Sequence, residues 1–271
     1  MKYAVVGKPR IDYLVSPSEE SGLADEGLYG MPLEILGEEN GFYKVKTHYG
    51  YTGYAKGKDM VMIDENQLNI WILDSKFTII KDIADLLSGP NCKHRSMITL
   101  YRGSKIISLG QEEGNFTKVQ LLDGSTGYIR SEFIKKDEFI DPFANEEEFR
   151  ERLIKTALMY METQYKWGGK TPMGIDCSGL TSMSYMLNGV LIYRDAKLEG
   201  DNLFEISRDQ LKKGDLIYFP GHIAMYIEDG LFIHSVDRYN GVTLNSLNED
   251  DPLYSKYHSE NITMCGSIFR P

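Results

Sequence analysis

Cys177 lies where a loop meets the expected start of a helix, in the run Asp-Cys-Ser-Gly at residues 176–179. Backbone N–H groups without helical partners and the positive end of the helix dipole lower the pKa of a cysteine there, which favours the nucleophilic thiolate. The loop before it contains three glycines, which let the backbone approach a ligand closely: Gly168, Gly169 and Gly174. Taken alone, the pattern fits a nucleophile and a structural cysteine at a helix cap equally well.

Two histidines further along the chain change this balance. His222 and His234 flank the pair Asp229-Gly230, which is a strong signal for a two-residue β-hairpin turn. In a regular hairpin His222 lies opposite Val236 or Asp237, and His234 lies about one step away on the same face. We therefore expect the two imidazole rings to touch on one face of the sheet. A catalytic histidine that is oriented through its other ring nitrogen has this arrangement.

The order cysteine, histidine, polar orienting residue is that of papain-like peptidases, and such a site needs no metal and no other cofactor. Zinc is the alternative, because cysteine and histidine are good zinc ligands, but the close CxxC or HxxxH spacing is absent. We interpret the other cysteines, Cys92 and Cys265, as small buried hydrophobic residues. The remaining histidines have no motif around them, and we interpret them as surface or structural residues: His48, His94 and His258.

Two helices are expected to carry the cysteine and its support. The first follows an Asn145 cap and a turn of three glutamates, and its apolar spacing continues to Met161. The second begins near Cys177 and stops at Asn188-Gly189. Strands are expected after these helices, at residues 215–219, 223–227, 231–236, 241–244 and 265–269. Helices followed by strands predict an α+β domain over residues 139–271.

The first half of the chain contains an internal repeat. Residues 28–54 and 100–128 share Leu-Tyr at the start, a glycine-containing turn next to an aromatic residue, and Thr-Gly-Tyr at the end. Both copies show short alternating strands separated by turns rich in Gly, Glu and Asn. We expect two small all-β barrels, residues 1–65 and 66–138. They resemble bacterial SH3-like domains, with simple spacers as the alternative interpretation.

The second half resembles the NlpC-type cell-wall peptidases. The signature is Tyr-Lys-Trp-Gly-Gly at residues 165–169, followed by Gly-Ile-Asp-Cys-Ser-Gly-Leu at residues 174–180. Further matching runs are Gly-Asp-Leu at 214–216, Gly-His-Ile-Ala-Met-Tyr-Ile at 221–227 and Phe-Ile-His-Ser at 232–235. The resemblance covers residues 145–271 and implies a papain-like fold. Two SH3-like domains ahead of it match one architecture within that family.

The resemblance implies a γ-D-glutamyl-L-diamino-acid endopeptidase that acts on peptidoglycan stem peptides with a free N-terminal L-Ala. It makes Cys177 the nucleophile, His222 the base and then the acid, and His234 the residue that orients His222. It places Asp176 at the free amine, where a carboxylate forms a charge-assisted hydrogen bond. The other residues that it assigns to the substrate are Ser178, Tyr165, Trp167, Tyr51, Asp195 and Glu26. A barrel packed over one end of the groove would exclude longer chains.

Composition narrows the range of partners. A formal net charge of −10 repels nucleic acid and also anionic wall polymers, so small soluble peptides are the expected substrates. No apolar run approaches the ~20 residues needed to span a bilayer, so no membrane insertion is expected. The apolar stretch at the start of the sequence is too short for a signal peptide, and charged residues interrupt it too early. This predicts a cytoplasmic protein, or an exported one if a signal has been removed ahead of Met1.

Two other functions fit parts of this pattern. A wall amidase or acyltransferase would use the same cysteine and histidines. A non-catalytic wall-binding module would use the barrels alone, although the complete set of Cys177, His222 and His234 argues against it. The sequence leaves open which diamino acid is accepted, the oligomeric state and the role of the second barrel.

Overall fold

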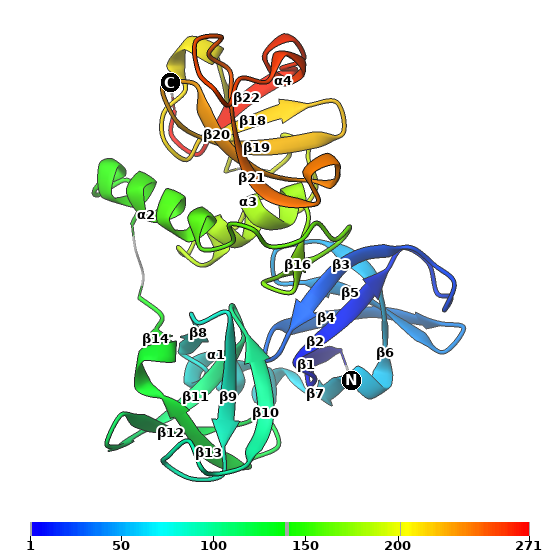
Figure 1. Cartoon of the computed structure of the whole chain (residues 1–271). Coiled ribbons are helices and arrows are strands. Elements are labelled where there is room, and N and C mark those ends of the chain that lie inside the picture. Colours follow the sequence, from blue (N-terminus) through cyan, green and yellow to red (C-terminus); the bar gives the residue numbers. More distant parts are fainter. Residues whose placement is uncertain (1, 139–140, 201, 271) are drawn as a thin grey trace. The chain divides into compact units, whose positions relative to one another are not determined.

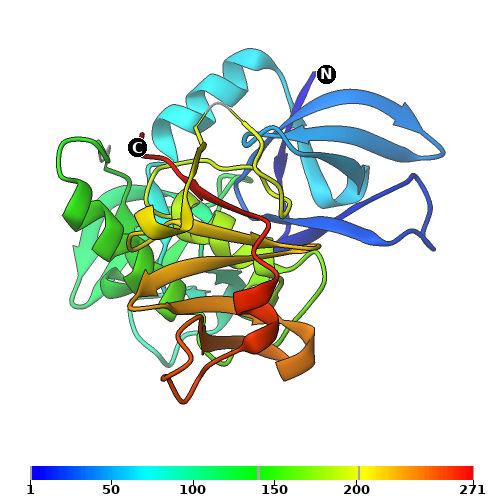
Figure 2. The same cartoon turned by 90° about the horizontal axis from the view of Figure 1, so that it is seen from above.

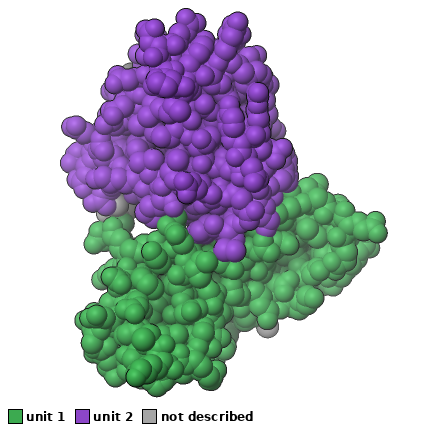
Figure 3. Space-filling view, viewed as in Figure 1, with its two compact units in different colours: residues 1–138 green, residues 139–271 purple. Residues whose placement is uncertain are grey.

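The computed structural model describes residues 2–138, 141–200 and 202–270. The chain divides into two compact units, residues 1–138 and 139–271, which are coloured separately in Figure 3. Phe139 and Ile140, where the sequence predicts the start of the third domain, lie outside the described residues. Within the described ranges, no helix combines the length and the apolar character needed to cross a membrane.

Seven antiparallel strands form the first part of unit 1, in the sheet order β3-β2-β6-β5-β4-β1-β7 (Figure 1). They are β1 (Tyr3–Val6), β2 (Arg10–Leu14), β3 (Leu23–Leu28), β4 (Pro32–Glu39), β5 (Phe42–Thr47), β6 (Thr52–Lys56) and β7 (Met60–Ile63), with the 3-10 helix η1 (Gly57–Asp59) before β7. The turn between β4 and β5 is Asn40-Gly41. Its positive φ angles of 51° and 79° suit the hairpin turn that this residue pair favours.

The second part of unit 1 repeats this topology strand for strand, in the order β10-β9-β13-β12-β11-β8-β14. Its elements are β8 (Phe77–Ile79), β9 (Ile83–Leu87), β10 (Ser96–Tyr101), β11 (Lys105–Glu113), β12 (Phe116–Gln120), β13 (Thr126–Arg130), the 3-10 helix η2 (Ser131–Phe133) and β14 (Ile134–Lys136). The internal repeat is therefore a repeat of fold as well as of sequence.

Helix α1 (Glu65–Asp74) joins the two sheets and was not expected from the sequence. Its start is fixed by a capping box in which Asp64 and Gln67 exchange backbone and side-chain hydrogen bonds. Trp71 on this helix is buried and donates from Nε1 to the Gly30 carbonyl at 2.8 Å. The Tyr29 hydroxyl accepts from the Leu122 amide at 2.6 Å. These contacts tie the two barrels into one unit.

Unit 2 places its two longer helices before a six-stranded antiparallel sheet of order β17-β22-β18-β19-β20-β21, which confirms the α+β class. The elements are α2 (Glu146–Leu158), β15 (Lys170–Thr171), β16 (Gly174–Ile175), α3 (Cys177–Met186), β17 (Phe204–Ile206), η3 (Arg208–Gln210), β18 (Leu216–Phe219), β19 (His222–Glu228), β20 (Leu231–Val236), η4 (Asp237–Tyr239), β21 (Gly241–Ser246), α4 (Lys256–Glu260) and β22 (Met264–Ser267). In Figure 2 the yellow and orange strands of this sheet run side by side. Helix α3 packs against β19 and β20.

The hairpin of β19 and β20 carries both predicted histidines. Asp229 and Gly230 form its turn with φ angles of 49° and 87°, as the sequence predicts. Glu228 pairs with Leu231, but a bulge at Ile227 shifts the register by one residue for the rest of the ladder. The hairpin is therefore not regular, although both imidazoles still reach the same face.

Candidate active site

Cys177 is the first residue of α3, and its thiol is buried, with the residue 8% exposed. Residue Asp176 caps this helix, because its side chain accepts a hydrogen bond from the Gly179 amide at 2.6 Å. The backbone amides of Ile223 and Ser178 both act to lower the pKa of the Cys177 thiol. Ile223 follows His222 on β19, and α3 packs against β19. We therefore predict that the thiol lies near the His222 imidazole.

Burial, followed by the nearby Asp176 charge, raises the pKa of Cys177 to about 11. The amide of Ile223, the guanidinium of Arg194 and the amide of Ser178 act in the opposite direction and are outweighed. The amide of Ser178 at the helix start lowers this pKa as expected, but the expected net lowering is wrong because burial outweighs it. The carboxylate of Asp176 already occupies the positive helix end and opposes a second negative charge there. The resting thiol is protonated at neutral pH and needs a base.

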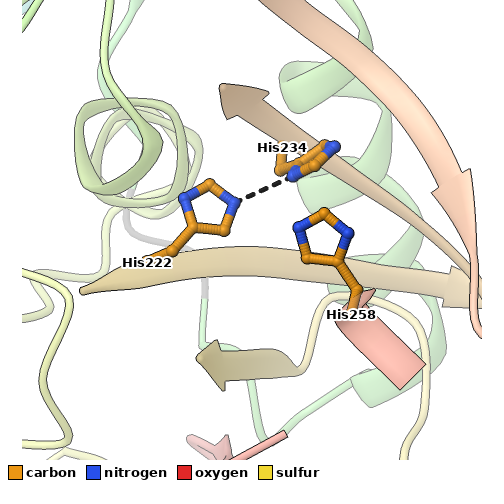
Figure 4. Close-up of side chains that lie close together, drawn as sticks. All are labelled: His222, His234 and His258. Atoms are coloured by element: carbon orange, nitrogen blue, oxygen red, sulfur yellow. Dashed lines mark hydrogen bonds between the residues drawn. The ribbon is translucent and has the colours of Figure 1, made fainter. Parts of the chain in front are cut away.

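His222 and His234 form a hydrogen-bonded pair, which confirms the predicted contact between the two imidazoles. Nε2 of His222 lies 2.8 Å from Nδ1 of His234, as the dashed line in Figure 4 shows. Phe219 stacks on His222 with ring centroids 5.8 Å apart. His234 is fully buried, and its Nε2 lies 3.0 Å from Oδ1 of Asn245. Because His222 uses Nε2 for this contact, we predict that its Nδ1 is the nitrogen that serves the thiol.

Burial also controls the charge state of this pair. It lowers the pKa of His222 to about 4, with a smaller contribution from His258 in the same direction. It lowers the pKa of His234 to about 3, with His222 and His258 adding to the effect and Asn245 opposing it. Both imidazoles are therefore neutral near pH 7. A neutral His222 is in the right form to accept the proton of the thiol.

His258 is the third member of this cluster, and the sequence gave no motif to reveal it. It lies on the short helix α4, is buried, and has its ring centroid 4.9 Å from that of His234. Its Nδ1 bonds the Ser255 hydroxyl at 2.7 Å. The interpretation of His258 as a structural residue holds only in part, because its ring forms one wall around the His222–His234 pair. The other two histidines without a motif, His48 and His94, are exposed as expected.

The three imidazoles lie close enough together to be considered as ligands of a metal ion. One ligand nitrogen from each of His222, His234 and His258 lies within 4.8 Å of the others. However, Nε2 of His222 and Nδ1 of His234 point at one another and share a proton at 2.8 Å. Two nitrogens in that arrangement cannot both direct lone pairs at a single ion. A metal would have to break the pair, and a site without a metal remains our prediction.

Asp176 is surrounded by hydrogen-bond donors. Its carboxylate accepts from the amides of Gly168 at 2.7 Å and Gly179 at 2.6 Å. It also accepts from both terminal nitrogens of Arg194, at 3.0 and 3.2 Å. Arg194 is 1% exposed and donates to the Ser178 hydroxyl at 2.7 Å. Arg194 therefore locks the loop before Cys177 onto the start of α3, a role that the sequence did not reveal.

The other predicted substrate residues fall into two groups. In unit 2, Tyr165 is partly buried, and burial followed by the Cys177 and Asp176 charges raises its pKa to about 12, so its hydroxyl stays neutral near the nucleophile. Trp167 is 69% exposed and Asp195 is partly exposed. In unit 1, Glu26 is fully buried and pairs with Arg10 at 2.5 Å, while Tyr51 precedes β6. Their roles in substrate binding stay predictions.

The remaining cysteines have separate positions. Cys265 is buried on β22. Cys92 is exposed, so its interpretation as a buried hydrophobic residue is wrong. It lies in a loop between β9 and β10, where the short run of polar residues offers no core to enter.

A buried cysteine at a helix N-terminus, a neutral histidine on the adjoining strand and a second histidine behind it define a papain-like cysteine peptidase. Comparison with known proteins agrees. Residues 162–261 match the profile of the NlpC/P60 family, and residues 15–61 match the bacterial SH3 domain. The chain belongs to the NlpC/P60 family and is an enzyme of the cysteine peptidase type.

Individual relatives extend over the whole chain. The chain is 41% identical over 271 residues to a protein of Lysinibacillus sphaericus named dipeptidyl-peptidase 6, covering 98% of this chain and 99% of that protein. It is 27% identical to the γ-D-glutamyl-L-lysine dipeptidyl-peptidase of Bacillus cereus, covering 83% and 71%. A crystal structure of an NlpC/P60 family protein from Bacillus cereus has a TM-score of 0.80 at 20% identity, covering 97% of this chain and 98% of that one, and shows that the fold is shared.

Proposed function

We propose that this peptidase hydrolyses the bond between the γ-carboxyl group of D-Glu and the diamino acid in peptidoglycan stem peptides with a free N-terminal L-Ala. The observation that carries the proposal is the similarity to dipeptidyl-peptidase 6, which includes both the barrels and the catalytic unit. The second relative is named for the γ-D-glutamyl-L-lysine bond. A wall-binding role without catalysis would not require the buried Cys177, His222 and His234 arrangement.

We propose the following order of proton transfers, which the neutral His222 imidazole supports. Nδ1 of His222 accepts the thiol proton while the sulfur of Cys177 forms a bond to the γ-carbonyl carbon. The tetrahedral adduct collapses, and the amine of the diamino acid leaves with the proton from His222. A thioester of L-Ala-D-Glu then remains on Cys177. A water molecule, deprotonated by His222, attacks this ester and releases the dipeptide and the thiol.

The lowered pKa of His222 leads to a prediction about pH. Because burial favours the neutral imidazole, the base stays unprotonated well below pH 6.5, the ordinary pKa of histidine. We expect kcat/KM to remain on its plateau down to about pH 5 and to fall as pH approaches the His222 pKa of about 4. The measurement is kcat/KM on the tripeptide between pH 3 and 8, with reassay at pH 7 to exclude irreversible unfolding. An acid limb centred at 6.5 or above would show that His222 is solvated rather than buried in the free enzyme.

Recognition of the free amine is the finer part of the proposal. Asp176 is the predicted anchor, yet Arg194 already compensates its charge. An ammonium group brought there would also meet the guanidinium, so a second carboxylate is needed. The other acidic residues that the resemblance assigns are Asp195 and Glu26, and the charge of Glu26 is itself compensated by Arg10. We propose that these acids act together with Tyr51, Tyr165, Trp167 and Ser178. A small peptide also suits a surface with net charge −10 better than an anionic wall polymer does, and on that ground we propose turnover of wall peptides in the cytoplasm.

The test of amine recognition is a matched pair of substrates. L-Ala-γ-D-Glu-L-Lys and its N-acetyl derivative differ only in the charge and size of the N-terminal group. We expect kcat/KM to be about 10- to 100-fold lower for the acetylated peptide than for the free-amine peptide. The reason is that a hydrogen bond to a charged group in a buried site is worth roughly 1.5–3 kcal/mol. Equal rates for the two peptides would contradict recognition of the free amine. The assignment of the cleaved γ-bond would then be tested separately, by identifying the products. The Ala-γ-Glu-meso-diaminopimelate peptide, assayed in parallel, identifies the preferred diamino acid.

A further inference from the structure

Asn245 extends the row of catalytic side chains by one residue. It lies on β21 opposite Phe232 of β20, which places it diagonally beside His234 on the same face of the sheet. Its Oδ1 lies 3.0 Å from Nε2 of His234, and its Nδ2 lies 3.1 Å from the carbonyl oxygen of Leu253. The residue is 9% exposed. Both ends of the amide are therefore engaged inside the protein.

The Leu253 carbonyl fixes which way this amide points. A carbonyl oxygen only accepts hydrogen bonds, so the group that faces it must be the NH₂ of Asn245. The same oxygen accepts from the Ser246 amide at 2.8 Å, which holds it in place through the main chain. The amide oxygen of Asn245 must then face His234, where it can only accept.

The direction of the remaining hydrogen bonds follows from this anchor. His234 must carry its proton on Nε2 to donate to Asn245, so in its neutral form Nδ1 is a lone pair. That lone pair accepts from Nε2–H of His222. His222 in turn has its own lone pair on Nδ1, the nitrogen that is left for Cys177. The Leu253 carbonyl thus fixes the orientation of the Asn245 amide, the amide fixes the tautomer of His234, and His234 fixes the tautomer of His222.

We infer that Asn245 is a positioning residue that sets the tautomer of His222 through His234, so that the lone pair of the catalytic base faces the thiol. Without this anchor the pair can reverse, with His234 donating from Nδ1 and His222 protonated on Nδ1. In that form His222 presents N–H to the sulfur and cannot accept a proton. A backbone carbonyl has no charge and does not titrate, so the direction it sets does not change with pH.

Two substitutions separate this role from simple packing. Asn245→Leu keeps the branched shape, in a somewhat larger side chain, but removes both the acceptor for His234 and the donor for Leu253. Asn245→Asp keeps an acceptor for His234 but places a buried charge against the Leu253 carbonyl. If Asn245 only fills space, the leucine variant is the milder change. If Asn245 sets the tautomer, the aspartate variant retains more activity, because it still accepts from Nε2–H.

We expect Asn245→Leu to lower kcat by about 10- to 100-fold with KM changed less than threefold, a part of the 10²–10⁴ that a positioned base contributes. Asn245→Asp is expected to retain more of kcat and to move the acid limb of the pH profile upward, because a carboxylate stabilises protonated imidazole. Thr243→Val is the matched control, since Thr243 lies on the same strand as Asn245 and pairs with His234 of β20. It should keep kcat within about twofold. A leucine variant as active as wild type, or more active than the aspartate variant, would overturn the inference.

A second readout requires no substrate. Nitrogen-15 NMR of the imidazole side chains distinguishes Nδ1–H from Nε2–H tautomers, and the chain has only five histidines to assign. Wild type should show His222 and His234 both protonated on Nε2, and Asn245→Leu should show Nδ1–H at His222. A wild-type His222 protonated on Nδ1 would contradict the inference directly. The kinetic arm rests on the proposed function, whereas the NMR arm does not, so a failure of the substrate assignment and a failure of the tautomer assignment are distinguishable.

Discussion

Cys177→Ala is expected to lower kcat/KM on L-Ala-γ-D-Glu-L-Lys by about 10⁴-fold or more, the scale of loss seen when a nucleophile is removed from such a site. The neighbouring Ser178 is not expected to replace the thiol. The adjacent Ser178 hydroxyl is held by Arg194 at 2.7 Å and lies 3.4 Å from the Asp176 carboxylate. Alanine removes one buried sulfur and leaves the helix cap intact, so the fold should be retained. Steady-state kinetics and circular dichroism of the purified variant measure both effects.

The control for this experiment is Cys92→Ala. Cys92 is the exposed cysteine, on the loop between β9 and β10, and no step of the mechanism uses it. Its replacement should leave kcat/KM within about twofold and reduce the rapid labelling of the protein by iodoacetamide. If Cys177→Ala instead kept kcat/KM within tenfold of wild type, Cys177 could not be the nucleophile.

Arg194→Met is the second substitution that we expect to have a large effect, in this case on both stability and activity. Arg194 is 1% exposed and pairs with Asp176 at 3.0 Å while holding the Gly169 carbonyl and the Ser178 hydroxyl. Removing it leaves the Asp176 carboxylate buried beside an apolar chain, which costs about 3–5 kcal/mol of unfolding free energy. The loop that carries Tyr165 and Trp167 also loses the attachment to α3 that Arg194 provides through the Gly169 carbonyl, so kcat/KM should fall with stability. Urea unfolding followed by far-ultraviolet circular dichroism measures the first quantity.

A double-mutant cycle distinguishes the ion pair from general damage to the loop. Asp176→Asn in the Arg194→Met background removes the unpaired charge and should recover about 1–3 kcal/mol, so the two changes are strongly non-additive. Arg152→Met is the matched surface control, because Arg152 pairs with Glu148 on an exposed face of α2 at 2.6 Å. It should cost less than about 1 kcal/mol. Equal costs for Arg194→Met and Arg152→Met would show that the buried pair has no special weight.

The parts of this protein that the sequence predicts are those set by local patterns. Asp229-Gly230 defines the hairpin turn and brings His222 and His234 to one face, even though a bulge at Ile227 alters the register. The Asp-Cys-Ser-Gly run marks the start of α3, and the strand repeat predicts two barrels of one topology. In each case a few neighbouring residues determine the backbone conformation.

The parts that the sequence does not predict depend on contacts between distant residues. Arg194 reaches Asp176 across 18 positions, and Asn245 connects His234 to the Leu253 carbonyl. No spacing rule links these residues before the fold brings them together. The pKa of Cys177 is the clearest case. A helix N-terminus lowers a thiol pKa in general, but here burial and the capping carboxylate reverse the sign.

The most direct test of the account is the identity of the products formed from L-Ala-γ-D-Glu-L-Lys by wild type and by Cys177→Ala, determined by mass spectrometry. The account predicts that wild type yields the dipeptide L-Ala-D-Glu and free L-Lys in equal amounts, and that the variant yields neither. Release of free L-Ala, which requires cleavage of the other peptide bond, would contradict the proposed bond specificity. Formation of the same two products by Cys177→Ala at a comparable rate would contradict the catalytic site itself.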